Sequence, residues 1–190
     1  MPYVHFTGED RLYVGPVDNN GYRRTSHGED VMIGDDFSLA HKKLTGNIGI
    51  GYMTQSYQDS RFSTAHTFAF KGRLNWRPTD KTKASLYTDK SFYPTTLAGA
   101  SSELYSGVGA FVEHKLTPVL SLNLRGIYDH SDFRGISRKD NDYDTSVGLS
   151  YALSPHTYLA TDLRNEKRFS NAAGASFNRN EIFVQLGVYY

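Results

Sequence analysis

Charged side chains recur at alternate positions along this chain, and they are the residues best suited to act on a passing hydrophilic solute. Successive side chains of an extended strand point to opposite faces, so alternating charges share one face. In a sheet that closes into a barrel, one face would line the interior, or lumen. Our candidate lumen-lining residues are Lys71, Arg73, Arg77, Glu113, Arg125, Asp129, Asp144, Asp162, Arg164 and Glu166. Charges of both signs along a water-filled path tune the passage of ions. The alternative is that they pair across a filled, non-conducting interior.

No pattern in the chain points to catalysis, a bound metal or a cofactor. The seven histidines never take a His-x-x-x-His spacing, and no Gly-x-Ser-x-Gly, phosphate-loop or dinucleotide motif occurs. His130, Ser131 and Asp132 are adjacent, so on a strand they cannot converge as a triad. Cysteine is absent, which excludes disulfides and thiolate metal sites. The acidic run 140–144 could bind Ca²⁺ weakly, but we interpret it as a solvated loop.

Turn signals that alternate with long polar stretches predict the elements that hold these charges. Prolines 78, 118 and 155 mark short turns, and longer polar stretches lie between them. This rhythm indicates a repeated two-stranded hairpin. We expect strands at 2–15, 28–40, 45–58, 65–77, 82–93, 102–116, 119–131, 141–153, 157–169 and 179–190.

The predicted strands favour an all-β, antiparallel, up-and-down transmembrane β-barrel of about ten strands, alone or as part of a larger barrel. The segments are about 12 residues long, roughly twice the common strand of soluble sheets and long enough for the roughly 9–11 residues that a tilted membrane strand needs. In 119–131, leucines at 120, 122 and 124 alternate with polar residues, as in a barrel wall. Low mean hydropathy (−0.52) is compatible with such a wall, because only alternate residues meet lipid. A soluble β-sandwich explains the alternation but not the strand length or the loop rhythm.

Two residues fit this pattern badly. Asp35 falls on an otherwise apolar face, and we expect a β-bulge at Gly34 to turn it inward. Lys90 also falls among apolar neighbours, near the long-loop side, where its side chain could snorkel towards water.

The last ten residues form a strand with one apolar face that ends on an aromatic ring. Its apolar positions are Ile182, Val184, Leu186, Val188 and Tyr190. This pattern resembles the closing strand of bacterial outer-membrane barrels, whose assembly machinery recognises a terminal aromatic residue. We therefore predict that these five residues form an assembly signal. No signal peptide precedes the first strand, so we expect a mature form or a piece of a longer chain.

Several short stretches, taken in order, resemble the putative β-barrel porin 2 family of Gram-negative bacteria. They are LTGNIGIGY (44–52), YQDSRFS (57–63), LNWRPT (74–79), TTLAGAS (95–101), FRGISR (133–138) and LSYAL (149–153). Members of that family are about twice as long, so the resemblance implies that residues 1–190 are one outer-membrane barrel domain, the C-terminal half of a longer chain. It carries no catalytic motif.

We expect an outer-membrane, porin-like passive channel or export pore for hydrophilic solutes, with a link to exopolysaccharide export implied by the resemblance. The alternatives are a non-conducting structural or binding barrel and a soluble all-β binding module. The expected partners are outer-membrane lipid and lipopolysaccharide, the barrel assembly machinery and polysaccharide export components. Twenty-one Lys and Arg against 20 Asp and Glu give no signal for nucleic-acid binding.

Overall fold

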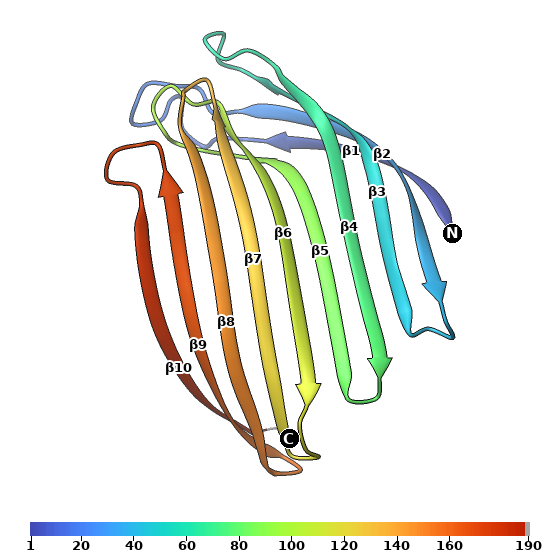
Figure 1. Cartoon of the computed structure of the whole chain (residues 1–190). Helices are drawn as coiled ribbons and strands as arrows, with labels where there is room; N and C mark the ends of the chain where they lie inside the picture. The colour runs from blue at the N-terminus through green and yellow to red at the C-terminus, as the bar shows by residue number, and fades with distance from the viewer. Residues whose placement is uncertain (189–190) are drawn as a thin grey trace.

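The computed structural model describes residues 1–188 and shows one antiparallel sheet whose strands follow the order of the chain (Figure 1). The strands are β1 (Pro2–Arg11), β2 (Ser26–Leu39), β3 (Leu44–Tyr57), β4 (Ala65–Thr79), β5 (Thr82–Tyr93), β6 (Ser102–Lys115), β7 (Leu120–Arg134), β8 (Lys139–Ser154), β9 (Thr157–Ser170) and β10 (Phe177–Val188). The all-β, up-and-down fold expected from the sequence is confirmed. No helix among the described residues is long and apolar enough to cross a membrane.

Each strand pairs only with its neighbours, so the described sheet has β1 at one edge and β10 at the other. The sheet curves along its whole width (Figure 1). No second sheet packs against it within residues 1–188, which separates the described fold from a β-sandwich.

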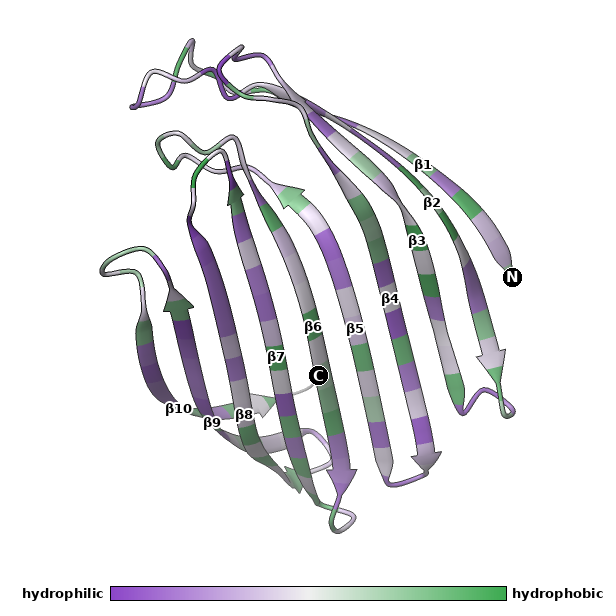
Figure 2. Cartoon of the chain, turned by 45° about the horizontal axis from the view of Figure 1, so that its top comes forward, coloured by the Kyte–Doolittle hydropathy of each residue, from purple (hydrophilic) through white to green (hydrophobic). Residues whose placement is uncertain are grey.

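The registers gather apolar side chains on one face of the sheet. Ile33, Ile50 and Phe70 lie side by side on β2, β3 and β4. Leu124, Val147 and Leu163 form a similar row on β7, β8 and β9. Figure 2 shows the resulting alternation of hydrophobic and hydrophilic residues along the strands. We call this side the apolar face and the opposite side the polar face. Large apolar side chains on the apolar face are exposed, with Phe68 at 76%, so this surface suits contact with lipid.

Connections of two lengths separate the two ends of the sheet. Residues 40–43, 80–81, 116–119 and 155–156 form the short turns at one end. Pro118 and Pro155 lie in these turns as predicted, whereas Pro78 lies in β4, just before its turn. Residues 12–25, 58–64, 94–101 and 171–176 form the longer loops at the other end. The long polar stretch expected between the predicted strands 119–131 and 141–153 is wrong, because β7 and β8 extend into it and leave only 135–138 as a turn at the long-loop end. We call the two ends the short-turn end and the long-loop end.

The bulge expected at Gly34 is absent. Pairing between β2 and β3 continues unbroken through this residue, so Asp35 stays on the apolar face opposite Ile48. A bulge does occur on β4, where the register with β5 shifts between Trp76 and Thr79. Pro78 lies within it and has no N–H to give to a ladder, which explains why the irregularity falls there.

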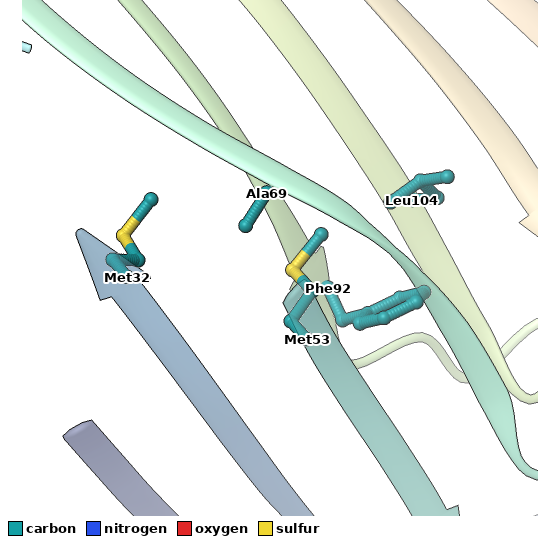
Figure 3. Close-up of a cluster of buried hydrophobic side chains, with 5 residues drawn as sticks. All are labelled: Met32, Met53, Ala69, Phe92 and Leu104. Atoms are coloured by element: carbon teal, nitrogen blue, oxygen red, sulfur yellow. The ribbon is translucent and has the colours of Figure 1, made fainter. Parts of the chain in front are cut away.

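A small hydrophobic cluster draws one side chain from each of five consecutive strands, β2 to β6 (Figure 3). Its buried members are Met32, Met53, Ala69, Phe92 and Leu104. β4 begins to pair with β5 only at Lys71, so its first residues are free to leave β5. The polar-face side chains of β3 and β4 thereby pack on Phe92 and Leu104, which occupy apolar-face positions of β5 and β6.

The same overlap settles the position of Lys90. Its Nζ donates a hydrogen bond to Thr67 Oγ1 on β4 at 3.0 Å and lies 6.0 Å from the Phe70 ring centroid. The amino group is therefore held by β4. The sequence had suggested that it would extend towards water, and this prediction is wrong.

Candidate polar pore face

The candidate lumen-lining residues share the polar face of the sheet. The two-residue period of side chains along a strand, together with the strand registers, places Lys71 and Arg73 on this face of β4 and Glu113 on the same face of β6. The same argument places Arg125 and Asp129 on β7, Asp144 on β8, and Asp162, Arg164 and Glu166 on β9. Arg77 follows the bulge of β4, and its backbone N–H donates to Lys43 O at 2.7 Å. That these residues line a lumen stays a prediction.

Asp144 is the centre of the ion pairs on the polar face. Its carboxylate accepts from Arg125 Nη2 on β7 at 2.7 Å. It also accepts from Nε and Nη2 of Arg164 on β9, at 2.8 and 2.7 Å. Only 12% of the Asp144 side chain is exposed, so this double pairing offsets the cost of removing its charge from water.

The network continues to the edge strand β10. Arg164 lies 3.9 Å from Glu181, and Arg179 contacts both Glu166 at 2.5 Å and Glu181 at 3.3 Å. The polar faces of β7 to β10 are therefore tied by alternating charges. Each link joins neighbouring strands or, for Arg179 and Glu181, two residues of β10, so the network lies along the wall and does not require side chains to meet across an interior.

The remaining candidates differ in their polar partners: some form ion pairs, one accepts a hydrogen bond from a tyrosine, and others form no ion pair within residues 1–188. Lys71 lies 3.7 Å from Asp89, and Glu113 pairs with Lys83 at 3.1 Å. Asp129 accepts a 2.5 Å hydrogen bond from the Tyr105 hydroxyl and makes no arginine pair within residues 1–188. In the same residues no ion pair occurs for Arg73, Arg77 or Asp162.

The curvature of the sheet encloses a hollow of about 880 Å³ next to the polar face. Arg77 of β4 and Phe183 of β10 both line it, although five strands separate β4 from β10. We call it the large hollow. A second hollow of about 500 Å³ lies by β1 to β5 and is lined by Glu9, Arg11 and Lys71, among others. We call it the β1 hollow. Both are open to solvent and lined by charged and hydroxyl groups.

A family model described as putative beta-barrel porin 2 matches residues 1–190. The chain belongs to the putative β-barrel porin 2 family. This match confirms the resemblance seen in the sequence and agrees with an up-and-down sheet that has one apolar and one polar face. A comparison with curated proteins finds no match.

The acidic run of this porin-family chain is not the solvated loop that we expected. Residues 140–144 belong to β8, and their polar-face carboxylates each face an arginine. Asp140 pairs with Arg138 at 2.6 Å, and Asp142 with Arg168 at 2.7 Å. Within residues 1–188 no three His, Asp or Glu side chains come together in a group that could hold a metal ion.

A compact cluster at the long-loop end, which we call the loop cluster, was not predicted from the sequence. Arg24 is its centre: its Nε donates to Asp18 Oδ2 at 2.7 Å, and its Nη groups donate to the carbonyl oxygens of Leu97 and Ala100. The Arg24 and Asp18 side chains are only 7% and 2% exposed. One arginine thus joins loops 12–25 and 94–101, which lie far apart in the sequence.

A second carboxylate fixes loop 58–64 against the same cluster. Asp59 accepts from the Arg61 guanidinium and from the backbone N–H of Arg23 at 2.8 Å. The Arg61 guanidinium, followed by the Arg23 N–H, lowers the pKa of Asp59 well below its ordinary value. Tyr22 stacks on Phe62 with ring centroids 5.0 Å apart, and Arg61 lies 4.1 Å from the Tyr22 ring.

The cluster extends to the turn between β7 and β8. Gly99 and Gly135 both have positive φ, and a Cβ on Gly135 would lie 2.5 Å from the Gly99 carbonyl oxygen. Glycine is therefore required for the two backbones to approach this closely. Three of the stretches that suggested the family, 57–63, 95–101 and 133–138, meet here. Their arginines, aspartate and glycines were the signal in the sequence that could have predicted contacts between loops.

The predicted assembly signal lies on the apolar face of β10. Ile182, Val184, Leu186 and Val188 alternate with polar-face residues and are 56–75% exposed. Tyr190 lies outside the described residues. Recognition of this strand by assembly machinery stays a prediction.

Proposed function

We propose that this chain forms the wall of an outer-membrane pore through which hydrophilic solutes pass passively. The observation that carries the proposal is the division of one curved sheet into an exposed apolar face and a charged polar face next to an 880 Å³ hollow. Lipid and lipopolysaccharide would cover the apolar face, and water would fill the concave side. The proposal includes delivery by the barrel assembly machinery and assigns no catalytic residue.

Apolar and aromatic side chains support a position in the membrane. Trp76 and Tyr151 lie towards the short-turn end, and Tyr128 and Tyr143 lie towards the long-loop end with ring centroids 5.1 Å apart. All four are exposed on the apolar face. Aromatic side chains of this kind favour the two membrane–water interfaces, and residues such as Leu124 and Val147 occupy the band between them.

A link to polysaccharide export is a finer proposal, supported by the family resemblance alone. A polymer of that kind needs a polar, water-filled path, and the polar face offers charged groups, amides and hydroxyls along one. Export components would be the partners in this case. Uptake of small solutes needs the same wall, so the fold is compatible with both directions of transport.

A non-conducting barrel is the second candidate, and the ion pairs favour it. The links from Arg125 through Asp144 and Arg164 to Glu181 stabilise the wall, as in a barrel with a purely structural role. The large hollow, however, leaves room for water beside that network.

Planar-bilayer recordings of the full-length protein separate the two candidates. We expect discrete current steps whose ion preference changes when Lys71, Arg73 and Arg125 are replaced by glutamate, because these residues share the polar face. Replacement of the exposed Lys139, on the apolar-face side of β8, by glutamate is the control and should leave the preference nearly unchanged. Failure to conduct in several preparations of folded protein would support the structural barrel.

A further inference from the structure

The two hollows on the polar face differ in charge. The large hollow is lined by five cationic and two anionic side chains, which are Lys42, Arg77, Lys83, Arg125, Arg164, Glu113 and Asp162. The β1 hollow is lined by three cationic and four anionic side chains, which are Arg11, Lys71, Lys90, Glu9, Glu29, Asp30 and Asp36. The positive charge of the large hollow is therefore a local property of one part of the wall, in a chain whose formal net charge is +1.

Two of the five cationic side chains in the large hollow are left without an ion pair. Lys83 pairs with Glu113, and Arg125 and Arg164 both pair with Asp144. Lys42 and Arg77 make no ion pair within residues 1–188. Asp162 on β9 is the one lining carboxylate in that part of the chain without an ion-pair partner.

The backbone holds these two cations at the short-turn end of the hollow. The Arg77 N–H donates to Lys43 O at 2.7 Å, which ties β4 to the turn that carries Lys42. That turn is tightly wound, with positive φ at Ala40, His41 and Lys42. The Arg125 guanidinium lies 5.7 Å from the Phe111 ring, further along the same hollow.

We propose that the large hollow is an anion-binding site that selects carboxylated or sulfonated hydrophilic solutes over neutral and cationic ones. The inference deepens the proposed pore, because it requires water to reach the polar face. Lys42 and Arg77 attract the anion at the short-turn end, and the Arg125–Asp144–Arg164 group presents guanidinium N–H donors beyond them. Charged side chains along a water-filled path select ions by this means.

Charge-selective labelling of single cysteines tests the hollow without requiring any current. The chain has no cysteine, so Ser85→Cys places one thiol in the large hollow and Asn47→Cys places one in the β1 hollow. Each thiol is reacted with an anionic sulfonate and a cationic trimethylammonium methanethiosulfonate reagent. The ratio of the two rates cancels differences in thiolate content, because both reagents attack the same thiolate.

We expect the anionic-to-cationic rate ratio in the Ser85→Cys protein to exceed that in the Asn47→Cys protein by roughly tenfold at low salt. A positive unit charge about 6 Å from the thiol raises the anionic rate and lowers the cationic rate by about threefold each in water, and the two factors multiply in the ratio. Adding Lys42→Gln and Arg77→Gln should reduce the Ser85 ratio by at least about threefold. Equal ratios at the two positions, or a Ser85 ratio unchanged by the two substitutions, would overturn the proposal.

Reversal potentials in a KCl gradient separate this inference from the proposed pore. A conducting wild type that prefers chloride, with the preference reduced in the Lys42→Gln, Arg77→Gln protein, supports both. A conducting wild type that prefers potassium rejects the anion-binding site and leaves the pore intact. A folded protein without current rejects the pore, and the cysteine ratios still decide the charge preference of the hollow.

Discussion

At the scale of single residues, Asp144 links β8 to the strands on both of its sides. It accepts hydrogen bonds from two arginines on two different strands. Asp162, two positions from Arg164 on the same face of β9, makes no ion pair within the described part of the chain. The two aspartates therefore form a matched pair for measuring what the network contributes.

We expect Asp144→Asn to lower the free energy of unfolding in detergent by about 1–3 kcal/mol, the cost of leaving partly buried donors poorly satisfied. Asp162→Asn should change it by less than about 0.5 kcal/mol, as for a site without such partners. Urea titrations followed by heat-modifiable gel migration would measure both. Equal losses in the two variants would show that the network does not stabilise the wall.

The loop cluster depends on two ionised carboxylates, and this makes its order sensitive to acid. Burial raises the pKa of Asp18, but the Tyr22 N–H, the Arg24 guanidinium and the Asn20 N–H outweigh it and lower the pKa overall. The pKa of Asp59 is lowered mainly by Arg61. Groups with lowered pKa values stabilise the folded state above the unfolded-state pKa of about 3.9 and lose that contribution as the pH falls through the folded-state pKa.

We therefore expect loops 12–25 and 58–64 to stay protected from hydrogen exchange between pH 7 and 5, and to lose protection as the pH falls below about 4. Asp59→Asn should expose loop 58–64 already at pH 7. The β7–β8 pairing serves as the internal reference at each pH. Unchanged loop protection at pH 2.5 would argue against a cluster held by these carboxylates.

At the scale of strands and turns, alternation was the strongest signal in the sequence. It predicted ten strands, and most bounds lie within two or three residues of the structure, because apolar positions such as Leu120, Leu122 and Leu124 repeat with the period of a strand. The polar-face positions of the candidate residues follow from the same period. The local pattern alone was thus enough to predict the strands and the face on which each candidate residue lies.

The features that the sequence did not predict depend on contacts between distant segments. From its local sequence the Asp140–Asp144 run looks like a loop. The arginines that allow it to be part of a strand include Arg164 and Arg168 of the next strand, some 20 residues away. The cluster around Phe92 and Leu104 needs β4 to cross β5, and the loop cluster needs Arg24 to reach Ala100. A bulge was expected at Gly34, yet the register is interrupted beside Pro78, where proline cannot donate to the ladder.

The assignment of faces predicts that one charge has opposite consequences on adjacent residues of β7. Leu124 lies on the apolar face in a row with Val147 and Leu163, and Asn123 lies beside Glu113 on the polar face. We expect Leu124→Lys to destabilise the protein in lipid vesicles by about 2–4 kcal/mol, the cost of lysine in mid-bilayer. Asn123→Lys should cost less than about 1 kcal/mol, because water reaches it. Similar effects of both substitutions would contradict the assigned faces.

At the scale of the whole molecule, the family and the fold agree on a barrel wall, while β1 and β10 remain the two edges of the described sheet. Unpaired strand edges are not tolerated in the hydrocarbon region of a membrane. In the membrane, we therefore expect both edges to be paired, either with each other or with further strands. The polar face would then enclose the large hollow on all sides.

Alternating water accessibility along β7 in proteoliposomes tests the central claim most directly. Single cysteines at 121, 123 and 127 lie on the polar face, and those at 122, 124 and 126 on the apolar face. A membrane-impermeant thiol reagent, present on both sides of the bilayer, should label the first set, while the second set stays unreactive until detergent is added. Equal labelling of both sets in intact vesicles, or preferential labelling of the second set, would contradict a wall with lipid on one side and water on the other.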